Sequence, residues 1–241
     1  MASRQRSKEA DRVARADSVA VIGLGRFGRS LALELMASGT EVLGIDARED
    51  IVQELNGQLT HVVQADSTRE AVLRQLAVPE FDRVVVAIGS DVQASILTTS
   101  LLVGFGIPGL WAKAISEAHG RILEQLGVPH VVFPESDMGR RVAHLVRGSM
   151  QDFLEIGNDF SLVKMAPPVS IVGKTLAESQ VRTKGGVTVV AVRKAGGSWT
   201  YTTADTLIAE GDTLLVGGPT GKAEAFSQLG CAGAPHAGRA D

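Results

Sequence analysis

Cysteine is almost absent from this chain, since Cys231 is the single cysteine among 241 residues. One cysteine excludes an internal disulfide framework, which fits a reducing cytoplasm. Aromatic residues make up only 4% of the chain and the net charge is −3. This composition lacks the basic and aromatic surface that is typical of nucleic-acid binding, so we expect no nucleic-acid partner.

The chain also lacks an apolar run long enough to span a bilayer. Its most apolar stretch, residues 96–111, is interrupted by Gly104, Gly106 and Pro108. Residues 1–17 are polar and charged and contain no apolar core of the kind that a signal peptide needs. We therefore expect a soluble protein in which residues 1–17 form a disordered arm.

What the sequence does contain is an apolar run over 19–22, followed at once by the pattern Gly23-x-Gly25-x-x-Gly28 and by helix-forming residues. This order predicts a strand, a tight turn and a helix. In such a turn the first glycine permits the bend, the second lets a phosphate approach bare backbone, and the third lets the helix pack closely on the strand. The N–H groups at the helix start then face an anion.

A second apolar run ends in Asp46, which lies 18 residues after Gly28. This is close to the spacing of about 20 residues at which an acid binds the ribose of a dinucleotide. The glycine pattern and Asp46 suit NAD as well as they suit ATP. Arg26 lies inside the turn, where its guanidinium either reaches a phosphate or remains a solvated surface group.

Strand and helix patterns alternate from residue 18 to about residue 148. The predicted strands are 18–22, 41–45, 60–64, 83–88, 110–114 and 130–133, and the predicted helices are 26–38, 48–56, 69–76, 91–104, 116–126 and 136–148. Six such units in sequence predict an α/β fold with a Rossmann-like, doubly wound parallel sheet. Ligands of these sheets bind beyond the carboxyl ends of the strands.

Polar residues follow several of these strands and have more than one interpretation. Residues 66–68 either cap the next helix or contact a ligand, and Asp91 is predicted to cap a helix. Lys113 ends a strand, where it contacts a phosphate or another subunit or is a plain edge residue. Glu135 falls in the first turn of a predicted helix, where an acid complements the helix dipole.

The alternation stops at about residue 151, and a different pattern begins. Strands are predicted at 160–165, 187–193, 199–201 and 212–217, and helices at 174–179 and 223–229. This pattern predicts a small α+β domain over 151–220, after a first domain over 18–150 and before a tail over 221–241.

Several phrases of the sequence resemble the RCK family, the regulators of K⁺ conductance. They are GLGRFG at 23–28, ADST at 65–68, VAIG at 86–89, WAKA at 111–114, PESDMG at 134–139, IVGKTL at 171–176 and LIAEGDTLLV at 207–216. The first five resemble the family's TrkA-N domain, and the last two resemble its small TrkA-C domain. The chain is most similar to the cytosolic regulatory subunits of Ktr- and Trk-type potassium uptake systems, in their Ktr form.

The resemblance implies a regulatory subunit rather than an enzyme. Family members form dimers that assemble into an octameric ring beneath a membrane-embedded potassium-translocating subunit, and ATP or ADP changes the shape of the ring. The second domain dimerises separately and in some relatives binds cyclic di-AMP. The chain is therefore expected to be cytoplasmic and held at the inner face of the cell membrane through its partner.

The resemblance also implies a set of site residues. Gly23, Gly25, Arg26, Phe27 and Gly28 would hold phosphates, Asp46 and Arg48 would flank the ribose, Asp66 and Ser67 would lie by the adenosine, Ile88 and Lys113 would complete the site, and Glu135 would lie near the phosphates or bind an associated metal cation. Ala65 and Ser67 depart from the family's usual Gly-Asp-Ala-Thr, which bears on the preference for adenine.

An NAD-dependent oxidoreductase is the alternative function, because the glycine pattern and Asp46 suit NAD(H). It finds no support in the histidines of the chain. None of His61, His119, His130, His144 and His236 lies in a recognisable proton-relay motif with Lys, Tyr or Ser.

Overall fold

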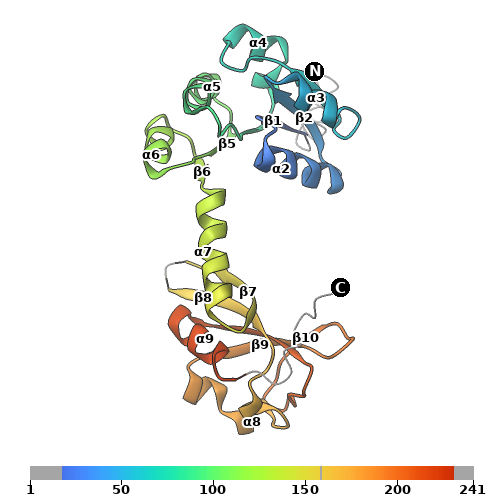
Figure 1. Ribbon diagram of the computed structural model, residues 1–241, viewed down its shortest axis with the longest axis vertical. Coiled ribbons are helices and arrows are strands. Elements are labelled where there is room, and N and C mark those ends of the chain that lie inside the picture. The colour runs from blue at the N-terminus through green and yellow to red at the C-terminus, as the bar shows by residue number, and fades with distance from the viewer. Residues whose placement is uncertain (1–17, 158, 231–241) are drawn as a thin grey trace, which may run out of the picture. The chain divides into compact units, whose positions relative to one another are not determined.

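A computed structural model describes residues 18–157 and 159–230 of the chain (Figure 1). The predicted arm over 1–17 and the end of the predicted tail, residues 231–241, lie outside the described residues. Contacts within the chain divide it into two compact units between Glu135 and Ser136. Among the described residues, no helix combines the length and the apolar content that crossing a membrane requires.

The first unit is built on a six-stranded parallel sheet, as the sequence predicts. Its strands are β1 (Ser18–Ile22), β2 (Glu41–Asp46), β3 (His61–Gln64), β4 (Arg83–Val86), β5 (Gly109–Lys113) and β6 (His130–Val132). Their order in the sheet is β3-β2-β1-β4-β5-β6, the order of a Rossmann fold. Ile22 at the end of β1 pairs in register with Ile45 of β2 and Val86 of β4, so these strands end at one edge.

Helices cover both faces of this sheet. They are α2 (Arg26–Ala37), α3 (Glu49–Leu55), α4 (Glu70–Gln75), α5 (Val92–Phe105) and α6 (Glu117–Gln125). Val19 and Val21 of β1 lie in one apolar core with residues of α2 and α3. Ala20 and Ile22 lie in a second core with residues of α4, α5 and α6. The strands read as continuous apolar runs because each of their faces is buried under helices.

Helix α7 (Pro134–Arg147) begins with the last two residues of the first unit, and the rest of it belongs to the second. Leu145 packs against the apolar core of the second unit. Arg141 donates from Nε to Asp152 Oδ1 at 3.2 Å, and His144 is hydrogen-bonded to Glu224 and stacks on Phe153. These contacts explain why the units divide at Glu135 rather than at residue 150.

The second unit contains a five-stranded antiparallel sheet. Its strands are β7 (Met150–Glu155), β8 (Phe160–Met165), β9 (Thr188–Arg193), β10 (Trp199–Tyr201) and β11 (Thr213–Pro219), in the order β10-β9-β11-β8-β7. The sequence does not predict β7. Its pairing with β8 shifts register between Met150 and Asp152, so the buried residues Met150 and Phe153 do not follow a simple alternation.

Short helices complete the second unit. They are α8 (Leu176–Ser179) and α9 (Thr220–Ser227), with a π-helical turn over Val181–Gly185. Thr175 and Glu178 form a capping box at the start of α8. Ala223 and Phe226 of α9 are buried in the core of this unit. Helix α9 therefore belongs to the second unit, although the sequence analysis begins a tail at residue 221.

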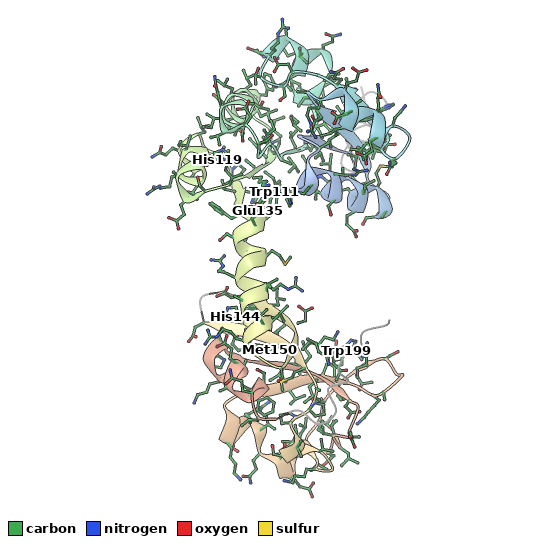
Figure 2. All side chains as sticks on the ribbon, in the orientation of Figure 1. Trp111, His119, Glu135, His144, Met150 and Trp199 are labelled. Carbon is green, nitrogen blue, oxygen red and sulfur yellow. The ribbon has the colours of Figure 1, made fainter. Side chains whose placement is uncertain are left out.

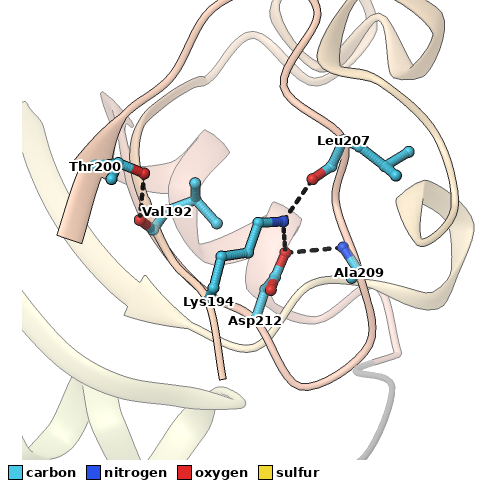
Figure 3. A network of polar contacts seen from close by, with 6 residues as sticks. All are labelled: Val192, Lys194, Thr200, Leu207, Ala209 and Asp212. Atoms are coloured by element: carbon cyan, nitrogen blue, oxygen red, sulfur yellow. Dashed lines mark hydrogen bonds and ion pairs between the residues drawn. The ribbon is translucent and has the colours of Figure 1, made fainter. Parts of the chain in front are cut away.

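A buried carboxylate fastens the loop before β11 to the end of β9. Asp212 is 4% exposed, and its Oδ2 accepts hydrogen bonds from Lys194 Nζ at 2.7 Å and from the Ala209 backbone N–H at 2.8 Å. Lys194 Nζ also donates to the Leu207 carbonyl at 2.7 Å (Figure 3). The charged groups of this network satisfy one another.

Candidate functional site

A cavity of about 770 Å³ opens at the carboxyl ends of the parallel strands in the first unit. This is the edge at which ligands of open α/β sheets bind. Of the residues predicted for the site, those that line the cavity are Gly23, Gly25, Arg26, Phe27, Asp46, Arg48, Asp66, Ser67, Ile88, Lys113 and Glu135. Gly28 is the predicted residue that does not line it.

The three glycines of the turn meet different surroundings. Gly23 has φ +91°, and a Cβ there would lie 2.8 Å from the backbone nitrogen of Ile88. A Cβ on Gly28 would lie 1.9 Å from the carbonyl oxygen of Gly23. A Cβ on Gly25 would meet no atom within 4 Å. Gly23 and Gly28 are thus required by the turn itself, whereas Gly25 leaves open space at the cavity.

Helix α2 begins at this turn without side-chain compensation. Gly25 is the N-cap residue and has no side chain with which to cap the helix, and the first turn carries no acidic residue. Arg26 instead adds positive charge to the positive end of the helix dipole. Free N–H groups and positive charge at a helix start are the conditions under which helices bind phosphate.

Asp46 ties the glycine turn to the end of β2. Its Oδ2 accepts the Leu24 backbone N–H at 2.7 Å, and its Oδ1 accepts the Arg48 backbone N–H at 2.9 Å. An ionised carboxylate has about four acceptor sites, so both oxygens retain capacity for the hydroxyl groups of a sugar. The sequence predicts the position of this acid but not its role in holding the turn.

The segment after β3 forms a turn of its own rather than a helix cap. Asp66 Oδ1 accepts the Thr68 backbone N–H at 3.0 Å and the Thr68 hydroxyl at 2.6 Å, and these bonds hold the pKa of Asp66 below its usual value. The N-cap residue of α4 is Arg69, which makes no side-chain cap. Ser67 is buried and its hydroxyl lies 2.9 Å from that of Thr98.

Helix α5 begins beside the cavity, where Asp91 and Ala94 are lining residues. Asp91 caps it as predicted, because its Oδ1 accepts the Ala94 backbone N–H at 2.9 Å.

Lys113 and Glu135 form an ion pair beside the cavity, with 2.6 Å between Nζ and Oε1. Lys113 is 7% exposed, and its Nζ lies 5.7 Å from the centre of the Phe27 ring. Glu135 lies at the start of α7 (Figure 2). The hydrogen bond from Lys113 lowers the pKa of Glu135, and the charge of Arg26 adds a smaller contribution.

The acidic residues do not form a metal site by themselves. In the part of the chain that the structure describes, no group of three or more His, Cys, Asp or Glu side chains is arranged to hold a metal ion. The described residues that line the cavity include no histidine or tyrosine.

A second, smaller cavity of about 430 Å³ lies in the second unit. It combines a basic residue with several hydroxyl groups, from Arg182, Thr183, Thr188, Thr202 and Thr203. The sequence analysis predicts no residue of this cavity, because its members come from separate strands and loops with no motif of their own.

Comparison with known families gives two matches. The TrkA-N domain family matches residues 19–134, and the TrkA-C domain family matches residues 160–229. The first match contains the parallel sheet apart from Ser18 and the cavity lining apart from Glu135. The second contains four of the five strands of the antiparallel sheet.

Curated relatives match along nearly their whole length. The Ktr system potassium uptake protein C of Bacillus subtilis is 39% identical over 198 residues, which span 82% of this chain and 90% of that protein. The Ktr system potassium uptake protein A of the same organism is 36% identical over 83% of this chain and 90% of that protein. The protein A of Vibrio alginolyticus is 34% identical over 84% and 93%.

Solved structures share the fold. The RCK domain of GsuK matches with a TM-score of 0.61 and 20% identity, over 90% of this chain and 48% of that chain. The GsuK channel bound to NAD matches with a TM-score of 0.61 and 19% identity, over 90% of this chain and 40% of that chain. At this identity the match establishes the shared architecture.

Proposed function

This chain belongs to the family of TrkA-N/TrkA-C (RCK) proteins, and from that premise we propose that it is a nucleotide-binding regulatory subunit of a potassium uptake system. The identity of 39% over 90% of a Ktr potassium uptake protein supports the process in which it acts. The observation that most supports nucleotide binding is the start of helix α2, which has no side-chain cap. Gly25 and Arg26 at this helix start line the cavity at the sheet edge.

The ligand that this cavity suits best is an adenine nucleotide, ATP or ADP. Its phosphates would meet the N–H groups from Gly25 onward and the guanidinium of Arg26. Its ribose would bind Asp46, with Arg48 beside it. Asp66 and Ser67 line the region predicted for the adenosine. NAD(H) satisfies the same phosphate and ribose contacts, and the related GsuK channel is described as bound to NAD, so NAD(H) is the second candidate ligand.

The mechanism is a shift between shapes of an assembly, with no chemical step. ATP and ADP regulate only if they bind two shapes with different affinity. The additional charge of the γ-phosphate supplies this difference if Arg26 contacts it directly and Glu135 contacts it through a divalent cation. These residues line the same cavity, and the charge of Arg26 already acts on Glu135.

The partners follow from the family. We propose that the chain forms dimers and an octameric ring, and that this ring binds a membrane-embedded potassium-translocating subunit at the inner face of the cell membrane. The cavity in the second unit, with Arg182 and its threonine hydroxyls, is the place that we propose for cyclic di-AMP.

Calorimetric titration with ATP, ADP, NAD and adenosine tests the nucleotide site. Arg26→Ala should weaken ATP binding about tenfold, equivalent to about 1.4 kcal/mol, and should change adenosine binding little. Arg29→Ala is the matched control, because Arg29 lies on the same helix but is ion-paired to Glu54 at 2.7 Å and does not line the cavity. Equal losses for ATP and adenosine would contradict the assignment.

Potassium uptake tests the regulatory role. Cells that express a Ktr-type membrane subunit together with this chain should take up potassium faster than cells that express Arg26→Ala with the same subunit. The proposed process would be excluded if the uptake rate were the same with the wild-type chain, with the variant and with the membrane subunit alone.

A further inference from the structure

The ion pair between Lys113 and Glu135 closes one side of the cavity with the chain's own charges. We propose that Glu135 is an internal substitute for the ligand's phosphate, which neutralises Lys113 in the unliganded protein and is displaced when a phosphate takes its place. This inference rests on the proposed function, since it requires an anionic ligand in the cavity. It makes Lys113 and Glu135 the pair that reads the charge of that ligand.

The buried ammonium group of Lys113 needs an anionic partner in both the free and the ligand-bound protein. Its side chain is 9% exposed, and its Nζ is packed against Gly89, where a Cβ would lie only 3.1 Å away. The Phe27 ring at 5.7 Å offers a weak attraction to the ammonium group. A buried ammonium without a partner is strongly unfavourable, so Lys113 exchanges one anion for another rather than remaining unpaired.

Glu135, in contrast, can lose its partner at little cost. Its side chain is 62% exposed, so water can solvate the carboxylate when Lys113 is taken from it. It lies in the first turn of α7, where the helix dipole favours a negative charge with or without Lys113. A glutamate carboxylate is ionised at neutral pH, so it competes with a phosphate for the lysine. The lysine is therefore the fixed partner and the glutamate the replaceable one.

The exchange predicts that Glu135 lowers the affinity for phosphates when no divalent cation is present. Calorimetry with ADP in excess EDTA measures this directly. Glu135→Gln should bind ADP about fivefold tighter than the wild-type chain, because the ion pair with Lys113 no longer has to be broken before the phosphate binds. Lys113→Met should bind ADP about tenfold weaker, and adenosine should bind all variants equally.

Two further variants make the result specific. In the Lys113→Met background, Glu135→Gln should change ADP affinity by less than about twofold, because its effect acts through the lysine. Asp137→Asn is the matched control: Asp137 lies on the same helix, is ion-paired to Arg140 at 2.6 Å, and does not line the cavity. It removes the same charge and should leave ADP affinity unchanged.

The outcomes separate this inference from the proposed function. If the wild-type chain binds ADP but Glu135→Gln binds it equally well or more weakly in EDTA, the exchange is wrong and the nucleotide site stands. If the wild-type chain binds none of the nucleotides, the proposed function fails first. A tightening by Asp137→Asn equal to that of Glu135→Gln would reduce the effect to general electrostatics and would also overturn the exchange.

Discussion

The two units of this chain differ in what their charged groups face. In the first unit, Arg26, Asp46 and Lys113 surround a cavity at the edge of the parallel sheet. In the second unit, Asp212 and Lys194 face each other and the backbone of the loop that they hold (Figure 3). We predict that the charged groups at the first-unit cavity serve ligand binding, whereas the Asp212–Lys194 network of the second unit serves stability. Substitutions should therefore separate the two properties by unit.

Gly28→Ala should have the largest effect and should lower stability and nucleotide binding together. Both properties depend on the close approach of Gly28 to the Gly23 carbonyl oxygen. The Cβ of the alanine would lie 1.9 Å from that oxygen, so the turn has to move. We expect a loss of about 3 kcal/mol of unfolding free energy together with the loss of nucleotide binding. Urea denaturation and ADP titration measure the two effects.

A matched control for this variant lies in α5. Gly104 is exposed inside a helix, and a Cβ there would meet no atom within 4 Å. Gly104→Ala should leave binding unchanged and raise the unfolding free energy by up to about 1 kcal/mol, because alanine favours the helix. If Gly28→Ala behaved like Gly104→Ala, the close approach at the turn would be wrong.

Asp212→Ala should show the separation from the side of the second unit. It removes the acceptor of Lys194 Nζ and of the Ala209 N–H, and we expect a loss of about 2 kcal/mol of unfolding free energy. ADP affinity should stay within about twofold of the wild-type value. The exposed neighbour Glu210 supplies the control, since Glu210→Ala should change neither quantity.

Between about pH 7 and about pH 5.5, the change of stability with pH should arise from one buried histidine of the first unit. His119 is 2% exposed, its Nε2 has no hydrogen-bond partner among the described residues, and burial lowers its pKa below 6.5. The unfolded chain then binds the proton more readily than the folded chain. Stability is complete above pH 6.5 and falls as the pH drops below that value, by at most about 1.4 kcal/mol per pH unit.

Urea denaturation of the wild-type chain and of His119→Gln checks this sign. The variant should show a smaller change in unfolding free energy between about pH 7 and about pH 5.5 than the wild-type chain does. An equal slope in both proteins would assign the dependence to other groups.

Gly25→Ala should have the smallest effect on stability and the clearest effect on binding. Gly25 has φ −63°, which alanine adopts freely, and its Cβ would enter open space at the cavity. The unfolding free energy should change by less than about 0.5 kcal/mol. ADP affinity should fall about tenfold or more, because the methyl group takes the space of the phosphate. A variant that binds ADP normally would place the phosphate elsewhere.

The order of elements in the first unit could be predicted from sequence because buried parallel strands and short connections leave local marks. The run over 19–22, the glycine turn and the cap at Asp91 are all readable in this way. Strand β7 could not be read, because its irregular register with β8 breaks the alternation that marks a strand. The division of contacts between Glu135 and Ser136 could not be read either, because α7 is amphipathic and the sequence does not say which core it joins.

The site shows the same limit. Its residue types and their position after the strands were predictable, because a parallel sheet brings its carboxyl ends to one edge. The pairing of Lys113 with Glu135 was not, since it joins residues 22 apart through the three-dimensional path of the chain. The turn that Asp66 forms with Thr68 was not predicted either, because the sequence offered residues 66–68 as a helix cap or as ligand contacts.

The claim that a nucleotide phosphate binds at the start of α2 is tested most directly by amide hydrogen exchange with and without ADP. ADP bound there should slow exchange in the segment 23–29 of the first unit, where the N–H groups at the helix start would gain phosphate partners. Exchange in β11 (Thr213–Pro219) of the second unit should not change. Saturating ADP that leaves segment 23–29 exchanging at its original rate would contradict the account.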